Sequence, residues 1–318
     1  MNKSIIPIFY TINDEYAKYV ATSIKSLLSN ASPNYHYNIH VIYEDISPKN
    51  KAILESLATE NSTIILDLMA EDLKMIDDSI GNRLRADIFT LTIYFRIFIP
   101  LLYPQYDKCI YIDSDTVVVQ DISQLFFEDI GDNYFGCVID KSTIDNEILA
   151  NYFEQVVGIP RDKYINSGML LLNSQKLREK HFEQKFLYLF NKYHFDVIAP
   201  DQDYINSMCY GHIKYLNDKY DAMPNPNSPE QSNPVIVHYN LFQKPWHYDH
   251  VQYEDYFWHY AQMTPYYEEI KNIKANYTAE DKQLDDEHMD LMLKRAQTLI
   301  NEEITMAKVF GSGLEERL

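Results

Sequence analysis

The chain has 318 residues, of which 46% are hydrophobic and 24% are charged, so it can bury a full core. Its formal net charge of -19 at pH 7 argues against broad binding to nucleic acid or to an anionic membrane, because most of its surface repels negative charge. An anionic small substrate is compatible with this charge where a cation bridges it to the protein.

The cysteines and the hydropathy predict a cytoplasmic protein. Cys109, Cys137 and Cys209 lie far apart in apolar stretches and form no CxxC pair, so we expect buried free thiols, which suit a reducing compartment. The apolar run near the start is too short for a signal peptide, and no segment approaches the ~20 apolar residues of a membrane span. We therefore expect no transmembrane segment.

Apolar runs and amphipathic stretches alternate through the first two thirds of the chain. In chain order, the sequence predicts a strand at 5–11, a helix at 14–30, a strand at 37–43, a helix at 47–59, a strand at 63–69, a helix at 88–102, strands at 109–112, 134–139 and 169–172, a helix at 174–192 and a strand at 235–239. This order predicts an α/β domain with a mostly parallel central sheet.

The pattern changes near residue 252. From there on no convincing strand occurs and the spacing is helical, especially over 284–307. Acidic residues outnumber basic ones in this tail, unlike a basic amphipathic membrane anchor. We therefore divide the chain into an α/β domain at 1–262 and a C-terminal helical extension at 263–318, which packs on the main domain, on a second copy or on a partner.

The sequence contains neither GxGxxG nor GxxxxGK[ST], so a bound nucleotide diphosphate would have to be neutralised by side chains and a metal. Asp113-Ser114-Asp115 is the natural candidate, because it follows the apolar run 109–112 at the carboxyl end of a predicted buried strand. Its two carboxylates suit magnesium or manganese. The alternative is a solvated acidic turn between two strands.

A histidine and a lysine near the end of the α/β pattern are candidates for the same site. His238 ends the apolar run 235–237, and Lys244 follows six residues later. A lone histidine is usually structural, but together with two carboxylates it would complete a mixed metal site, with the lysine on a phosphate oxygen.

Two further polar triplets have simple structural explanations when each is considered alone. Asp201-Gln202-Asp203 follows Pro200 and is typical of the first turn of a helix. Asn166-Ser167-Gly168 is typical of a turn that enters the apolar strand predicted at 169–172.

Taken in order, these pieces resemble glycosyltransferase family 8, the retaining enzymes that include bacterial lipopolysaccharide galactosyl- and glucosyltransferases and glycogenin. The resemblance covers roughly residues 5 to 250, and no single piece of it is specific. The six matching stretches are Ile8 to Asn13 followed by Asp14 and Tyr16, Thr92 to Arg96, Tyr111 to Asp115, Asn166-Ser167-Gly168, Asp201-Gln202-Asp203, and His238-Tyr239 through Lys244-Pro245-Trp246.

The resemblance implies a GT-A fold and a UDP-hexose donor, UDP-galactose or UDP-glucose, held through Mn²⁺ or alternatively Mg²⁺. By position, the metal ligands would be Asp113, Asp115 and His238, and Lys244 would neutralise a phosphate. The other implied donor contacts are Thr11 and Asn13 near uracil, Ser114 beside the ligands, Arg96 near the sugar, Asn166 and Ser167 along its face, Asp201 on its hydroxyls and Gln202 beside the anomeric carbon.

Two departures from the family pattern bear on these roles. The family often has Asp where Asn13 stands, and Gly within the segment that is Asn240 to Gln243 here. Because Gln202 is an amide and a poor nucleophile, we favour front-face transfer over a covalent intermediate, with Asp201 as the lesser candidate nucleophile.

The leading hypothesis is thus a Mn-dependent retaining hexosyltransferase (EC 2.4.1 type) that acts on a glycan, glycoprotein or lipid-linked acceptor. One rival is a catalytically silent protein that binds a sugar nucleotide or serves as a scaffold through its helical tail. Another rival is a metal-dependent hydrolase of nucleotide sugars. The acceptor, the linkage and the oligomeric state are left open by the sequence.

Overall fold

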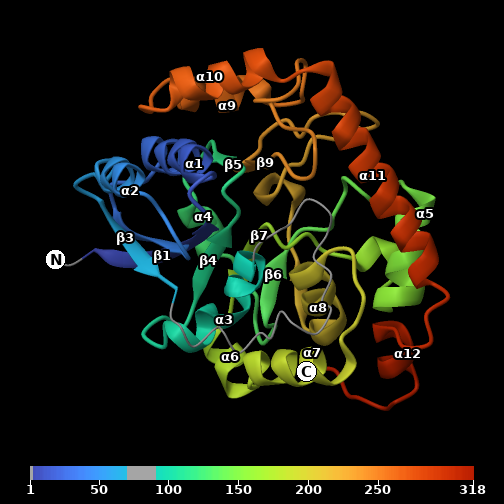
Figure 1. The fold of residues 1–318 in the computed structure, drawn as a ribbon. Helices are drawn as coiled ribbons and strands as arrows, with labels where there is room; N and C mark the ends of the chain where they lie inside the picture. The colour runs from blue at the N-terminus through green and yellow to red at the C-terminus, as the bar shows by residue number, and fades with distance from the viewer. Residues whose placement is uncertain (1–2, 70–90) are drawn as a thin grey trace.

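The computed structural model describes residues 3–69 and 91–318, which form a central sheet covered by helices on both faces (Figure 1). The main sheet has the order β3-β2-β1-β4-β7-β6-β8, and a small second sheet pairs β5 with β9. The strands are β1 Ser4–Ile12, β2 Tyr35–Tyr43, β3 Ser62–Leu68, β4 Cys109–Ile112, β5 Thr116–Val118, β6 Phe135–Cys137, β7 Met169–Leu172, β8 Ile213–Tyr215 and β9 Ile236–His238.

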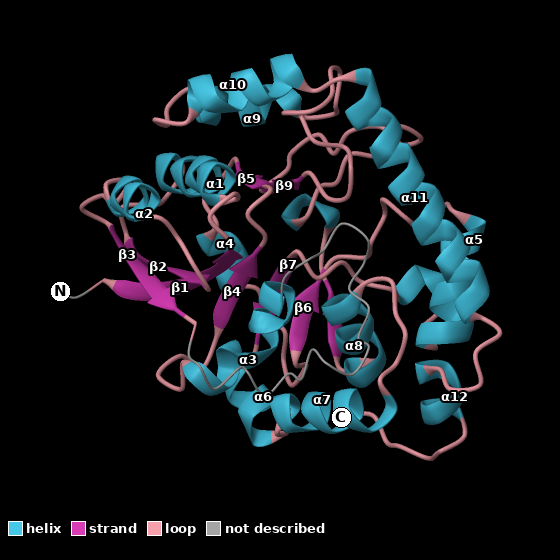
Figure 2. Cartoon of the chain, viewed as in Figure 1, coloured by secondary structure: helices cyan, strands magenta, loops and turns pink. Residues whose placement is uncertain are grey.

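Helices and loops make up the rest of the described chain (Figure 2). The first seven α-helices are α1 Ala17–Ser29, α2 Pro48–Glu55, α3 Phe95–Leu102, α4 Ser123–Phe126, α5 Glu147–Tyr152, α6 Ser174–Glu179 and α7 Phe182–Tyr193. The later ones are α8 Pro200–Cys209, α9 Glu254–Ala261, α10 Tyr267–Asn276, α11 Ala279–Leu299 and α12 Met306–Gly311. Short turns are η3 Leu91–Tyr94, η4 Phe153–Val157, η5 Arg161–Lys163 and η6 Asp218–Tyr220.

The predicted α/β class and the mostly parallel sheet are confirmed. Strands β3, β2, β1 and β4 run parallel to one another, and β6 is parallel to β8. Strand β7 runs antiparallel to both of its neighbours, with Ile112 opposite Met169. Because β7 is reversed, the residues just before it lie at the same sheet edge as the residues just after β4.

Alternation along β4 explains why this short strand is fully buried. Cys109 and Tyr111 belong to the apolar cluster on one face of the sheet, whereas Ile110 and Ile112 belong to the cluster on the other face. Successive side chains of a strand point to opposite faces, so a strand with helices on both sides needs apolar residues at every position. The three cysteines are buried and free, as predicted.

Several predicted helices differ in their limits from the observed ones. The helix predicted at 174–192 is two helices, because His181 takes a left-handed backbone conformation (φ 54°) and turns the chain between α6 and α7. The prediction at 88–102 begins outside the described residues and continues as η3 and α3. The helical stretch at 284–307 ends at Leu299 and resumes after Thr305, whose side chain caps α12 by accepting from Lys308 N.

The C-terminal helices pack on the α/β body (Figure 1). Helix α11 lies along α5, and α12 lies along η4. Met292, Ala296 and Leu299 of α11 are buried and belong to the same apolar cluster as Leu172 of the central sheet. Among residues 3–69 and 91–318, no helix has both the length and the apolar character that crossing a lipid bilayer requires.

Candidate functional site

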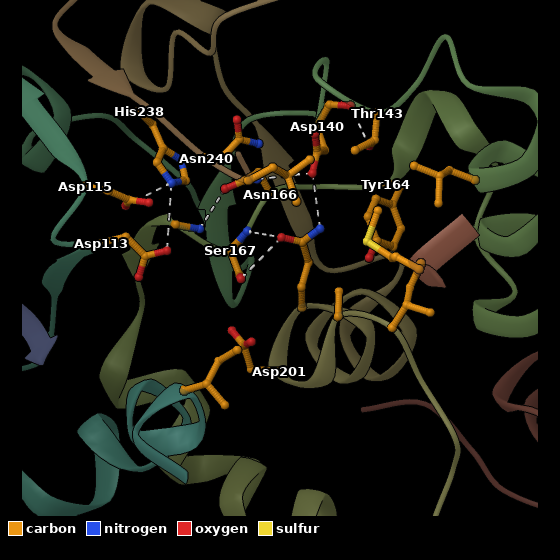
Figure 3. Close-up of a pocket in the computed structure, with 18 of the residues that line it drawn as sticks. Asp113, Asp115, Asp140, Thr143, Tyr164, Asn166, Ser167, Asp201, His238 and Asn240 are labelled. Atoms are coloured by element: carbon orange, nitrogen blue, oxygen red, sulfur yellow. Dashed lines mark hydrogen bonds and ion pairs between the residues drawn. The ribbon is translucent and has the colours of Figure 1, made fainter. Parts of the chain in front are cut away.

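Strand pairing brings the two aspartates and the histidine together at the carboxyl end of β4. The backbone N–H of Asp113 donates to the carbonyl of Gly168 at 2.8 Å. Pairing of β5 with β9 sets Thr116 opposite His238, so the histidine lies next to Asp115. One ligand atom from each of Asp113, Asp115 and His238 lies within 4.8 Å of the others, a spacing that a single cation could bridge (Figure 3).

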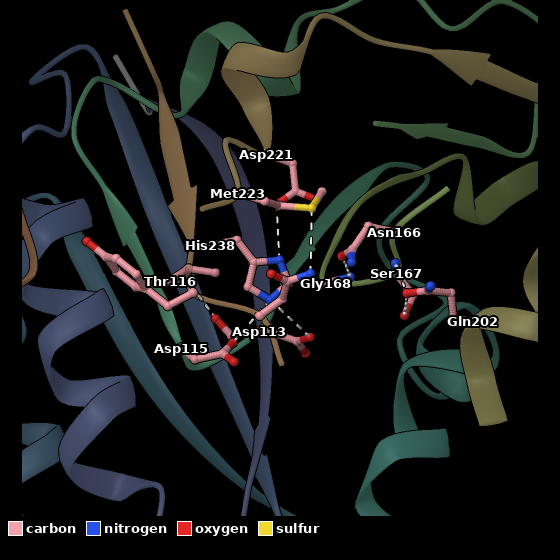
Figure 4. Close-up of polar contacts among 12 residues, drawn as sticks. Asp113, Asp115, Thr116, Asn166, Ser167, Gly168, Gln202, Asp221, Met223 and His238 are labelled. Atoms are coloured by element: carbon pink, nitrogen blue, oxygen red, sulfur yellow. Dashed lines mark hydrogen bonds and ion pairs between the residues drawn. The ribbon is translucent and has the colours of Figure 1, made fainter. Parts of the chain in front are cut away.

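A third carboxylate orients the histidine. His238 Nδ1 lies 3.1 Å from Oδ1 of Asp221, which leaves Nε2 facing Asp115 Oδ1 at 3.3 Å and Asp113 Oδ2 at 3.9 Å (Figure 4). A carboxylate on one ring nitrogen is the usual support for a metal-binding histidine. The sequence analysis missed Asp221, because only the bridge between Ala222 and β9 brings it beside His238.

The electrostatics of the cluster follow from this burial. Burial lowers the pKa of His238, but the carboxylates of Asp115 and Asp221 outweigh it and raise that pKa to about 10. Burial raises the pKa of Asp115, but the charges of Lys244 and His238 outweigh it and hold that pKa well below its usual range. Asp115 is therefore ionised, as a carboxylate ligand must be, and the positive charge of Lys244 faces it.

Two observations show that these residues fit a divalent cation. Oδ1 of Asp115 is buried and accepts no hydrogen bond from the described residues, so it retains lone pairs for a ligand. A Cβ added at Gly168 would lie 2.1 Å from His238 Cε1 and 2.8 Å from Asp113 Oδ2, so only glycine leaves room for the cluster. Two carboxylates and an imidazole suit manganese or magnesium.

Lys244 reaches the cluster from the segment that follows β9. Its Nζ donates to Oδ2 of Asp115 and to the carbonyl of Tyr239. Two residues further on, Trp246 stacks on Tyr19 with ring centroids 4.1 Å apart, within a buried apolar cluster. Leu241, within the segment where the family often has glycine, takes a left-handed conformation (φ 52°) of the kind that glycine favours.

Arg96 of α3 connects the aspartate pair with the start of α8. Its Nη2 lies 2.9 Å from Asp113 Oδ1 and its Nη1 donates to the carbonyl of Ser167 at 2.7 Å. Its Nε lies 3.1 Å from Oδ2 of Asp201, an ion pair outside hydrogen-bond geometry. The guanidinium also lies 4.3 Å from the ring centre of Tyr111. Burial raises the pKa of Asp201, against the opposing effect of Arg96.

A hydrogen-bonded network fixes Gln202 in the middle of the cavity. Its Oε1 accepts from Ser167 N at 2.9 Å, and its Nε2 donates to Asp140 Oδ2 at 3.2 Å. Asn166 Nδ2 donates to the same oxygen at 3.1 Å. The sequence analysis missed Asp140. This residue follows the strand Phe135–Cys137 much as Asp113 follows β4, so the rule that ligands bind at the ends of strands could have found it.

The predicted site residues separate into two groups. The cavity that contains the cluster is lined by Arg96, Asp113, Asp115, Asn166, Ser167, Asp201, Gln202, His238 and Lys244. The lining residues do not include Thr11, Asn13 or Ser114. Thr11 Oγ1 lies 2.9 Å from the hydroxyl of Tyr111, which donates to Asp113 at 2.6 Å, while Asn13 Oδ1 accepts from Tyr16 N at 3.1 Å.

The mixed sheet thus carries a cluster of two carboxylates and an imidazole at the carboxyl end of its central strand, β4. The model of the family described as "Glycosyl transferase family 8" matches residues 7–250. The chain belongs to this family, as the sequence motifs predict.

Curated relatives agree with this membership. A lipopolysaccharide 1,2-glucosyltransferase of Escherichia coli is 28% identical over 284 residues, covering 80% of this chain and 77% of the relative. A putative glycosyltransferase of Haemophilus influenzae is 27% identical over 250 residues, covering 76% of this chain and 72% of the relative.

Two solved structures share the fold. The galactosyltransferase LgtC, in complex with donor and acceptor sugar analogues, has a TM-score of 0.68 and 25% identity, and the match covers 82% of this chain and 96% of LgtC. The bifunctional glycosyltransferase WbbM has a TM-score of 0.73 and 22% identity, with 86% of this chain and 52% of WbbM covered. The GT-A fold class is thereby confirmed, together with a helical C-terminal region.

Proposed function

We propose that the chain is a retaining hexosyltransferase that moves galactose or glucose from a UDP-sugar to a hydroxyl of a glycan, glycoprotein or lipid-linked acceptor. The observation that carries the proposal is the cluster of Asp113, Asp115 and His238 at the carboxyl end of β4, within a GT-A fold. A glucosyltransferase and a galactosyltransferase among the related proteins support these two sugars.

Mn²⁺ is the proposed cofactor, with Mg²⁺ as the alternative, and Asp113, Asp115 and His238 would hold it. When bound, the cation stabilises negative charge on the departing diphosphate. Lys244, whose ammonium is buried beside Asp115, supplies a second positive charge for a phosphate oxygen. Asp221 keeps the His238 ring oriented through Nδ1, so that Nε2 faces the two aspartates.

The remaining residues would bind the donor. Arg96 would lie near the donor sugar, and Asp201, paired with it at 3.1 Å, would bind donor hydroxyls. The side chains of Asn166 and Ser167 would lie along the sugar. The proposed contacts outside the cavity are Thr11 and Asn13 toward the uracil and Ser114 beside the metal ligands.

Transfer on the front face accounts best for Gln202. The acceptor oxygen forms a bond to the anomeric carbon on the side from which UDP leaves, and the bond from that carbon to the phosphate oxygen breaks with its electron pair. The acceptor proton passes to the departing phosphate. Gln202, held by Ser167 and Asp140, orients the sugar. Asp201 is the lesser candidate for a nucleophile, because its carboxylate is paired with Arg96.

Residues 1–262 would form the catalytic domain and 263–318 its helical extension, in a protein that works in the cytoplasm. An association of copies through the C-terminal helices is part of the same proposal.

The decisive experiment incubates the protein with Mn²⁺ and a panel of UDP-sugars and measures UDP release, with and without glycan acceptors. Asp115→Asn is expected to abolish metal-dependent UDP release without unfolding the protein, whereas Asp132→Asn, at an exposed carboxylate, serves as the matched control. Full activity of Asp115→Asn would refute the metal assignment. Donor binding without release or transfer would favour the silent binder, and hydrolysis that no acceptor redirects would favour the hydrolase.

A further inference from the structure

The cavity has two ends of different chemistry. One end holds Lys244 and the cluster of Asp113, Asp115 and His238. The network around Gln202 lies between this end and Tyr164 (Figure 3). Apolar side chains also line this cavity, and they come from elements that pack together around Tyr164: Phe153 stacks on its ring, Leu149 lies in the adjoining α5, and Met292 lies in α11, which packs against α5. Figure 3 shows Tyr164 on the side of the cavity opposite His238.

The hydroxyl of Tyr164 is already used inside the protein. It donates to Oδ1 of Asp203 at 2.6 Å, and Tyr152 donates to the other oxygen of that carboxylate at 2.7 Å. The Tyr164 ring stacks on Phe153 with centroids 3.7 Å apart and an interplanar angle of 11°. Tyr164 can therefore offer a ligand its ring but no free hydroxyl, which keeps this end of the cavity apolar.

Met292 reaches the cavity from the C-terminal helix α11. The family match ends at residue 250, so this part of the wall comes from outside it. Met292 is 7% exposed and packs within the core cluster, where α11 runs along α5. Its neighbour Leu291 is 53% exposed on the same helix. The extension thus contributes one face to the cavity and leaves another face in solvent.

We propose that this apolar end binds an apolar group of the acceptor, such as an aryl or acyl substituent beside the hydroxyl that is glycosylated, and that Met292 determines this specificity. The inference rests on the proposed function, which assigns the cluster end to the diphosphate and the middle to the donor sugar. The end beyond Gln202 and Asp140 is the part of the same cavity left for the acceptor. A flexible thioether in the same cavity wall as two aromatic rings suits an apolar group of irregular shape.

The test compares methyl and phenyl β-glycosides of the same sugar as acceptors, using galactose, glucose and N-acetylglucosamine, with Mn²⁺ and the UDP-sugar that supports UDP release. We expect the phenyl glycoside to have a KM about tenfold lower than its methyl counterpart, because its ring is buried against the apolar wall. Met292→Ala is expected to reduce this preference to about twofold, and Met292→Leu to keep most of it. Leu291→Ala, the matched exposed control, is expected to keep it in full.

Readouts on the donor side separate the two proposals. UDP release without an acceptor and thermal unfolding are measured for every variant, so a folding defect is recognised. Absence of UDP release with every UDP-sugar overturns the proposed function itself. UDP release with an unchanged phenyl preference in a folded Met292→Ala overturns only the inference.

A measurement on the wild-type protein makes the test independent of folding of the variant. In wild-type protein labelled with ¹³C-methyl methionine, the NMR signal of Met292 is identified as the one that is missing from the spectrum of Met292→Leu. This signal is expected to shift when the phenyl glycoside is added and to stay in place with the methyl glycoside. No shift at saturating phenyl glycoside would also overturn the inference.

Discussion

Substituting Gly168 by alanine tests whether the cluster requires the close approach of the chain before β7. The new Cβ would lie 2.1 Å from His238 Cε1 and 2.8 Å from both Asp113 Oδ2 and His238 Nδ1, where ordinary contacts begin at 3.4 Å. Either the backbone at residue 168 shifts, or the His238 ring must move by about 1.3 Å and the Asp113 carboxylate by about 0.6 Å. No positive φ is recorded for Gly168, so the effect is steric and confined to the site.

The expected cost has two parts. Overpacking is expected to lower the free energy of unfolding by about 1–3 kcal/mol. Displacement of the ligands is expected to weaken Mn²⁺ binding by about 10–100-fold, the range found when the supports of metal ligands are removed. This loss corresponds to about 1.4–2.7 kcal/mol of binding free energy.

The assay is a titration of the folded variant with Mn²⁺, followed calorimetrically, alongside UDP release and thermal unfolding. Gly311→Ala is the matched control, because a Cβ there meets nothing within 4 Å and the residue lies in α12. The control is expected to bind Mn²⁺ as the wild type does. If Gly168→Ala bound Mn²⁺ within twofold of the wild type, the proposed packing of the site would be refuted.

Two further predictions concern Gln202 and Asp203. Gln202→Ala is expected to lower kcat about 10²-fold under front-face transfer, and a loss on the order of 10⁶ would instead indicate an essential nucleophile. Burial raises the pKa of Asp203 to about 6 from 3.8, although Tyr164 and Tyr152 lower it through hydrogen bonds. The folded state therefore holds this proton more tightly, so stability falls as pH rises from about 4 to about 6, by on the order of 3 kcal/mol. In Asp203→Asn, the free energy of unfolding measured with urea is expected to differ less between pH 4 and pH 8 than in the wild type. An unchanged difference would contradict the assignment of this pH dependence to Asp203.

The candidate metal ligands Asp113, Asp115 and His238 could be predicted from the local sequence pattern. Asp113 follows an apolar run that is buried on both faces of the sheet, and His238 ends another such run, so each lies at a strand end where ligands bind. The order of the six motifs then predicted family membership, which the family model confirms. Their roles in binding and catalysis stay predictions that the proposed experiments test.

Contacts between distant residues could not be predicted in this way. The partnership of Asp221 with His238 depends on a bridge between β9 and the segment around Ala222, which carries no motif. The link from Arg96 to both Asp113 and Asp201 joins three separate elements, and only their packing sets its distances. The break at His181 similarly depends on a left-handed turn that helical periodicity does not reveal.

The sequence by itself determined the α/β class, the candidate metal ligands and the helical character of the C-terminal region, because these follow from local periodicity and from residue types at strand ends. Only the tertiary structure decided that β7 runs antiparallel and sets Gly168 against the cluster, and that α11 brings Met292 to the far end of the cavity. Strand direction and helix docking depend on how apolar surfaces far apart in the chain are buried together, which no local pattern specifies.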